Sequence, residues 1–401
     1  MQTIKCINAA LKSSEGWLYI LILFSWVYPL LGLVNAVFLR VPGLDLIGPY
    51  MQITLYVCTI IFSTRAFVEK LKVSDVIFYF SICVIYLLQY ILFPQNTKYL
   101  DDDALRFIFS VVPFYFIGLV LDHTKIIKML FIASCIMILY RTYHDVFFVQ
   151  DYIGTLGDGE HTSAMWQSYS TLPYVLYVWW YMFRKLNIWG IAFSVVGLIL
   201  IVSYGNRGSL VCLISFVALY LLFFKHYRRK SLAYLIIVVI SCLFVYFSNE
   251  IILTIGSLAE NLGMSTRIIE RFLNSDFLKT SDRDYLIDQL LPYMKDMGFF
   301  GYGINGYYPL IGIYPHKIHF DLWVSFGYFV GTLIMFVLAY MPYKVYKKAK
   351  DGDTIQLLLL FLILGIEPLF FSFSFIIWPY FFLFIGFCVG RIRNVRLKLL
   401  L

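Results

Sequence analysis

Residues 281–291 read Ser-Asp-Arg-Asp-Tyr-Leu-Ile-Asp-Gln-Leu-Leu, and residues 314–321 read Tyr-Pro-His-Lys-Ile-His-Phe-Asp. Both stretches belong to the long polar part of the chain, which covers residues 249–318 and the few residues after it. Elsewhere the chain is apolar: 61% of all residues are hydrophobic, 14% are charged, and the mean hydropathy is +0.79. A soluble protein of 401 residues needs more surface charge. The sequence therefore predicts an all-α, polytopic integral membrane protein with its polar chemistry in one long loop.

Apolar runs that could cross a bilayer recur along the chain. A spanning helix needs about 20 apolar residues, because the bilayer core has no water to satisfy the backbone. About twelve runs approach this length: 17–38, 46–63, 75–93, 105–121, 126–140, 164–183, 188–204, 210–224, 232–248, 320–341, 355–370 and 375–390. The last two are nearly continuous, and only Glu367-Pro368 and the Ser372/Ser374 region indicate a turn between them.

The distribution of charge orients these runs, because short cytoplasmic loops hold an excess of Lys and Arg. With the N-terminus inside, most of the 32 basic residues lie in cytoplasmic loops, and the acidic residues 101–103 lie outside. Both termini are then cytoplasmic, and the loop at 249–318 joins the ninth and tenth runs on the periplasmic side. We expect one membrane domain over residues 1–401, whose first run stays as an anchor.

Charge and cysteine content argue against two classes of protein. The net charge of +8 follows from this topology and does not indicate nucleic-acid binding. Of the seven cysteines, none lies in an expected outer loop, so no disulfide framework is predicted. No Cys/His spacing typical of zinc sites occurs either.

An arginine flanked by glycines follows the seventh run, where residues 203–209 read Ser-Tyr-Gly-Asn-Arg-Gly-Ser. Arg207 in such a turn can approach an anionic ligand closely, and the N-terminus of the following helix favours the same negative charge. The alternative is an arginine that snorkels at the membrane interface and binds no ligand.

The long loop carries further arginines. Apolar residues recur at helical spacing after Arg283, which predicts a short amphipathic helix lying on the bilayer. Upstream, Arg267 and Arg271 lie four residues apart and would share a helix face. The forked donors of arginine match phosphate oxygens. Each arginine could instead be solvated or face a lipid headgroup.

Residues 297–308 read Met-Gly-Phe-Phe-Gly-Tyr-Gly-Ile-Asn-Gly-Tyr-Tyr. A glycine-rich turn is predicted here, because the stretch follows no strand and is not a dinucleotide-binding loop. Tyr302 and the tyrosines after it could stack on sugar rings, or they could form part of an interfacial aromatic belt.

His316 and His319 stand just before the tenth run. Neutral histidine is suited to accept a proton near neutral pH, and at a helix mouth it would be close to water and to a lipid-borne substrate. A local hydrogen-bonding role is the alternative. A metal site is not favoured, because Asp321 is the one nearby carboxylate that could complete it.

Taken together, these residues resemble the O-antigen polymerase and O-antigen ligase superfamily. The resemblance rests on Arg207 in its Gly-Asn-Arg-Gly turn, on Arg283 ahead of Gly298, Gly301 and Gly303, and on His316 followed by Gly327 and Gly331. It covers residues 204–332, together with the number of spans and the place of the long loop. The glycine spacing is more similar to polymerases, and Lys317 stands where ligases often have an asparagine. His319 is the rival of His316, and Arg141, at the outer end of the fifth run, is a further candidate.

The resemblance implies a glycosyltransferase of the C-type architecture in the bacterial inner membrane, acting at the periplasmic face. Such a polymerase moves a growing glycan from undecaprenyl pyrophosphate to the non-reducing end of a lipid-linked repeat unit. It needs no nucleotide sugar, no metal and no other cofactor. The implied partners are the undecaprenyl-pyrophosphate-linked oligosaccharide, the lipid bilayer, a chain-length regulator and a flippase, but no nucleic acid.

Roles for the candidate residues follow from this reaction. Arg207 and Arg283 would stabilise the leaving pyrophosphate, where a metal would otherwise serve, and His316 would activate the acceptor hydroxyl. A further group would bind substrate: Arg267, Arg271, His319, Tyr302 and Arg141.

Three other functions stay open. A ligase would transfer the glycan to lipid A core. A lipid-linked oligosaccharide flippase would place ionisable groups within its spans, where Glu367 is the main candidate. A protein that only organises partners would tolerate changes at all the residues named above.

Overall fold

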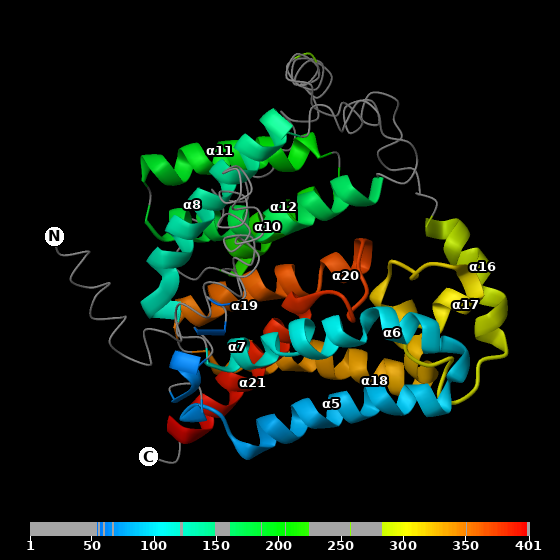
Figure 1. Cartoon of the computed structure of the whole chain (residues 1–401). Coiled ribbons are helices and arrows are strands. Elements are labelled where there is room, and N and C mark those ends of the chain that lie inside the picture. Colours follow the sequence, from blue (N-terminus) through cyan, green and yellow to red (C-terminus); the bar gives the residue numbers. More distant parts are fainter. Residues whose placement is uncertain are drawn as a thin grey trace. The chain divides into compact units, whose positions relative to one another are not determined.

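The computed structural model describes residues 54, 57–58, 61–65, 68–120, 123–148, 161–185, 187–204, 206–223, 257, 283–349 and 351–398. Every regular element in these ranges is a helix (Figure 1). Four helical stretches are long and apolar enough to cross a membrane: Val73–Leu92, Pro94–Val120, Ile318–Lys348 and Gly352–Phe371. The fold is therefore that of a helical membrane protein, whereas the expected total of about twelve spans stays a prediction.

Several expected runs coincide with single helices. These are α5 (Val73–Leu92), α8 (His123–Phe148), α10 (His161–Arg184), α11 (Ile188–Ser203) and α12 (Arg207–Phe223). The runs expected at 17–38 and 232–248, and most of the run at 46–63, lie outside the described residues. The first part of the long loop, up to residue 282, lies outside them as well except for residue 257.

The helices divide between two compact units. The first contains α8, the part of α10 from Ser170 onward and α11 as far as Leu200. There Gly197 of α11 lies against Val175 of α10, and Phe131 of α8 stacks on Tyr181 of α10 with ring centroids 4.2 Å apart. The second unit contains α5 from Ile77, the helices up to residue 119, the start of α10, α12 and everything from α16 onward.

The centre of the second unit is α19 (Gly352–Gly365), which contacts α12, α18 (Ile318–Lys348) and α21 (Pro379–Lys398). Its apolar residues other than Leu362 are buried, as expected of a helix that is hydrophobic all round. The helix begins where the Asp351 carboxylate accepts hydrogen bonds from the backbone N–H and the hydroxyl of Thr354, at 2.6 and 3.0 Å.

The turn expected between the last two apolar runs is confirmed. After α19 come the short helix α20 (Pro368–Phe371) and a non-helical segment at residues 372–378, before α21 begins at Pro379. Trp378 donates from Nε1 to the carbonyl of Leu364 at 2.6 Å, which satisfies an acceptor at the end of α19. The two runs are therefore separate elements.

The fourth expected run, 105–121, is not one regular helix. The chain forms a 3₁₀ turn at Pro94–Asn96, α6 (Thr97–Arg106), a π-helical turn at Phe107–Val111 and α7 (Phe114–Val120). Proline lacks a backbone N–H and clashes with the preceding turn, so Pro113 accounts for the irregular stretch before α7. The helical region also begins at Pro94, eleven residues before the start of the apolar run at 105.

The described part of the long loop is ordered against α18. The helix predicted after Arg283 is present as α16 (Arg283–Lys295), whereas its place on the bilayer stays a prediction. A short α17 (Tyr307–Ile311) follows the glycine-rich turn. Leu290 and Met294 of α16 form a buried cluster with Tyr307 and Val324. Figure 1 shows α16 and α17 together at the end of the second unit where α18 begins. The loop is thus held by apolar packing.

The helix α18 is interrupted at Gly327, whose φ of 78° and ψ of 165° are not helical. A side chain at this position would overlap the carbonyl of Phe299, and one at Gly301 would lie 2.5 Å from the carbonyl of Val324. At the break, the Val324 carbonyl accepts a hydrogen bond of 2.7 Å from the backbone N–H of Tyr302. Glycine at both positions therefore lets two backbones meet.

Close backbone contact between α7 and α21 gives a first prediction. A Cβ atom at Gly386 would overlap the carbonyl oxygen of Tyr115, which is backbone and cannot rotate away. Gly386→Ala should therefore destabilise the protein by about 1–3 kcal/mol through overpacking. The measurement is the thermal unfolding midpoint of the full chain purified in detergent.

Gly390→Ala is the matched control on the same helix, because its Cβ would lie 3.0 Å from the Leu119 carbonyl and needs a much smaller adjustment. An equal loss of stability in both variants would contradict the packing explanation.

Candidate functional site

The Arg207 turn begins α12, as the sequence predicts. Asn206 caps the helix, since its side-chain oxygen accepts a hydrogen bond of 3.0 Å from the backbone N–H of Gly208. Ser209 donates to the carbonyl of Asn206 at 3.0 Å and pairs with the hydroxyl of Ser168. The helix N-terminus thus has the amide groups and the positive end of the dipole that favour an anion. The side chain of Arg207 itself lies outside the described atoms.

Gly208 allows this turn to pack against Tyr169. A side chain at position 208 would overlap the Tyr169 hydroxyl and lie 3.1 Å from Cβ of Phe371. Tyr169 and Ser372 are fully buried, and the Ser372 hydroxyl donates to the Tyr169 hydroxyl at 3.0 Å. The turn that carries Arg207 is therefore joined to the non-helical segment at 372–378.

His316 contacts the same segment. Its Nδ1 lies 3.3 Å from the carbonyl oxygen of Ser372, and its ring centroid lies 4.3 Å from that of Tyr314. A carbonyl can only accept, so this contact requires a proton on Nδ1 and makes Nε2 the basic nitrogen. The backbone of His316 has a φ of 56°, a strained value that is uncommon outside glycine and concentrates at functional sites.

His319 occupies a different environment. It is half-buried in the first turn of α18, with ring centroids 4.6 Å from Phe320 and 5.4 Å from Trp323. These contacts are aromatic and do not reach the segment at 372–378. Of the two rival histidines, His316 is therefore the one that the structure links, through Ser372 and Tyr169, to the Arg207 turn.

The remaining candidates separate into two groups. Arg283 is the first residue of α16, and its side chain lies outside the described atoms, as do Arg267 and Arg271 in full. Arg141 belongs to the first unit, where its Nη2 donates to Ser170 at 3.0 Å. The helix α8 continues past Arg141 to Phe148, so the place of Arg141 at the outer end of a span stays a prediction.

Both polar groups of Tyr302, the hydroxyl and the backbone carbonyl, form hydrogen bonds within the protein. Its hydroxyl donates to the carbonyl of Tyr293 at 2.7 Å, and its own carbonyl accepts from Asn96 at 2.8 Å. Burial, followed by the negative charge of Asp296, raises the pKa of the Tyr302 phenol, so the hydroxyl stays protonated and continues to donate. Tyr302 thus anchors the glycine-rich turn.

Sequence reasoning missed a buried polar network beside this turn. Asn305 donates to the carbonyl of Tyr99 at 2.9 Å and to the carboxylate of Asp103 at 3.0 Å. The Tyr307 hydroxyl donates to Oδ1 of Asn305 at 2.9 Å and lies 3.3 Å from the Ser374 hydroxyl. Burial raises the pKa of Tyr307 well above its ordinary range, which keeps this donor protonated. The Asn-Gly dipeptide at 305–306 was the one local signal, because asparagine tolerates the φ of 61° found there.

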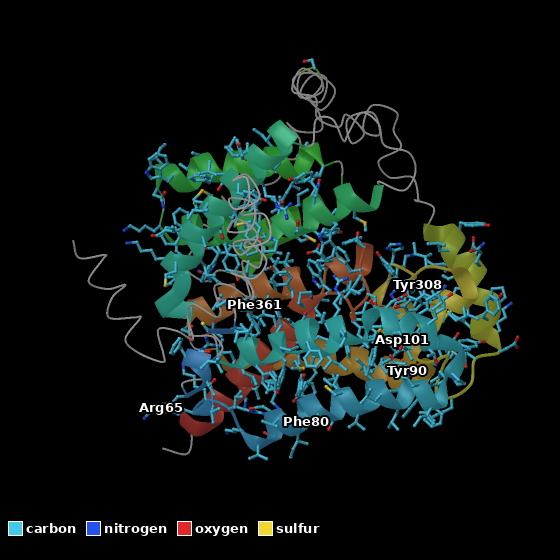
Figure 2. All side chains as sticks on the ribbon, in the orientation of Figure 1. Arg65, Phe80, Tyr90, Asp101, Tyr308 and Phe361 are labelled. Carbon is cyan, nitrogen blue, oxygen red and sulfur yellow. The ribbon has the colours of Figure 1, made fainter. Side chains whose placement is uncertain are left out.

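Tyrosines and carboxylates gather at this end of the second unit. Figure 2 shows Tyr90, Asp101 and Tyr308 close together there. The Tyr90 hydroxyl donates to Asp101 at 2.9 Å, and Tyr308 stacks on Tyr99 with ring centroids 4.9 Å apart. Aromatic faces beside carboxylates are suited to binding sugars, because a sugar ring can stack on an aromatic ring while the sugar hydroxyls donate to the carboxylates.

Among the described side chains, no three His, Cys, Asp or Glu residues gather as metal ligands. The expectation of a metal-free site remains a prediction, because part of the long loop is not described. Comparison with protein-family models, with curated proteins and with solved structures finds no match for this chain. The resemblance to the O-antigen polymerase and ligase superfamily accordingly stays a prediction too.

The polar network gives a second prediction. Tyr307→Phe removes the donor to Asn305 and leaves a buried acceptor without its partner, so stability should fall by about 1–3 kcal/mol. Tyr308→Phe is the control, because the phenyl ring at position 308 can still stack on Tyr99 without the hydroxyl. Thermal unfolding of both variants measures the difference. A larger loss in Tyr308→Phe than in Tyr307→Phe would show that the network does not hold this turn.

Proposed function

We propose that this protein is a membrane glycosyltransferase of the O-antigen polymerase type, which elongates a lipid-linked glycan at the periplasmic face of the bacterial inner membrane. One observation carries the proposal. The Arg207 turn and His316, which are far apart in the sequence, contact the two buried partners Tyr169 and Ser372. An anion-binding helix N-terminus and a basic histidine nitrogen on connected segments are the two groups that transfer from a pyrophosphate requires.

The proposed reaction gives each group a role. Nε2 of His316 accepts the proton of the attacking sugar hydroxyl as that oxygen bonds to the anomeric carbon of the donor. The bond between this carbon and the pyrophosphate oxygen breaks, and the leaving group takes the electron pair. Arg207 and Arg283, assisted by Arg267 or Arg271, stabilise the negative charge that develops on the pyrophosphate. Stacked tyrosines such as Tyr308 would hold the glycan.

A flippase is the second candidate, and two observations favour it. Helices of transporters are often interrupted near their binding sites, and here α18 breaks at Gly327 and the chain is non-helical at 372–378. Carboxylates also lie in or beside apolar helices: Asp321 is buried in α18, and Glu367 is partly buried in the turn between α19 and α20, where its Oε1 accepts from Ser215 at 2.6 Å. A flippase would not need His316 as a base.

A third prediction separates these functions. In a strain that lacks the gene, an envelope polysaccharide gel should show lipid A core with a single repeat unit, and the wild-type gene should restore the ladder. His316→Ala and Arg283→Ala should each fail to restore it at equal protein level, because each removes a group from the reaction. His319→Ala should retain most of the ladder.

Arg65→Ala is the control for the loss of a positive charge, because Arg65 is exposed and, among the described residues, its ion pair is an exposed one with Glu69. Core without any repeat unit in the deletion strain would indicate a ligase or a flippase. A full ladder with His316→Ala would exclude the proposed base.

A further inference from the structure

The buried carboxylate of Asp321 is not explained by the proposed reaction. Asp321 lies in the first turn of α18 with a side chain that is 1% exposed. Neither of its oxygens makes a hydrogen bond to a described residue, and the same holds for the hydroxyl of Ser325, one turn further along the helix. A buried polar atom without a partner costs about 1–3 kcal/mol, and a charged one costs more, so three such oxygens together indicate a ligand.

Further polar groups surround this carboxylate. The hydroxyl of Ser325 faces it within α18, and the hydroxyl of Ser374 and the backbone N–H of Phe375 face it from the non-helical segment, although none of the three reaches hydrogen-bonding geometry. Ser374 also accepts from the N–H of Ile376 at 3.4 Å and lies beside the Tyr307 hydroxyl, whose proton points to Asn305. The oxygens of Asp321, Ser325 and Ser374 thus converge on one place.

Charge decides what kind of ligand these oxygens require. Among the described residues Asp321 has no ion pair, and the titratable groups that act on it from α17 are Tyr307 and Tyr308. Burial raises the pKa of both phenols, so they stay neutral and supply no positive charge. The dipole of α18 compensates only part of the charge on a carboxylate in its first turn. A water molecule could fill hydrogen bonds but could not neutralise the acid.

We propose that Asp321, Ser325 and Ser374 form a binding site for a small monovalent cation, Na⁺ or H⁺. Hydroxyl and carboxylate oxygens are ligands for hard cations, and acidic groups beside interrupted helices bind coupling ions in membrane proteins. The site joins the break in α18 to the segment at 372–378, so its occupancy stabilises both. The inference does not depend on the glycosyltransferase proposal, and its test requires no activity.

The experiment follows thermal unfolding of the full chain, purified in detergent, by tryptophan fluorescence. NaCl replaces choline chloride at constant ionic strength, over a range of pH from about 5 to 8. A Na⁺ site predicts a saturable rise of a few degrees in Tm with Na⁺. A proton site predicts that Tm rises on acidification without Na⁺, because a proton then neutralises the carboxylate.

Variants test whether the Tm response to the cation depends on Asp321 and its neighbours. Asp321→Asn carries no charge, so its Tm should be insensitive to the cation that stabilises the wild type. Ser325→Ala removes one oxygen ligand and should raise the Na⁺ midpoint several-fold while leaving a proton response in place. Glu367→Gln is the matched control: it neutralises another partly buried carboxylate of the second unit, and it should keep the wild-type response.

Three results would overturn the proposal. The first is a wild-type Tm that is equal in Na⁺ and choline and also does not rise on acidification, which would mean that a basic side chain of the protein neutralises Asp321. The second is a response that survives in Asp321→Asn or disappears in Glu367→Gln. If Asp321→Asn does not fold, an unchanged Na⁺ midpoint in both Ser325→Ala and Ser374→Ala would be the third.

Discussion

Buried backbone outside a helix must find hydrogen-bond partners, and the segment at 372–378 of the second unit finds many of them nearby. Unpaired polar backbone groups that are buried away from water cost free energy, so this segment needs partners close at hand. The backbone N–H groups of Ser372 and Phe373 donate to the carbonyl of Pro368, and that of Ile377 donates to the carbonyl of Ser374. Side chains from other elements complete the pairing, and this brings distant parts of the chain to one place.

The proposed active groups depend on this segment. Ser372 donates through its hydroxyl to Tyr169, which packs on Gly208, and its carbonyl faces His316. Ser374 lies beside Tyr307 and faces Asp321. One irregular stretch thus contacts both the proposed transfer site and the proposed cation site. Hydrogen-bonded support of this kind is what positions catalytic groups within a fraction of an ångström.

Much of the framework could be predicted from the sequence, because apolar length and proline or glycine positions act locally. The start of α12 at Arg207, the helix after Arg283 and the turn between the last two runs follow from such signals. The irregular helical structure of Pro94–Val120 could not be predicted from the sequence, because hydropathy does not distinguish an α-helix from a π-helical turn of the same apolar composition. The burial of Asn305 in a polar network could not be predicted from the hydropathy pattern either, because its partners Tyr99 and Asp103 are distant in the sequence.

The sequence by itself determined that the chain is a helical membrane protein, because a bilayer accepts only segments that satisfy their own backbone. It also determined which residue types were available for pyrophosphate chemistry. Only the tertiary structure decided that His316, and not His319, contacts Ser372, and that the carboxylate of Asp321 is buried without an ion pair in the described residues. Both outcomes depend on contacts between residues far apart in the chain, which local composition cannot encode.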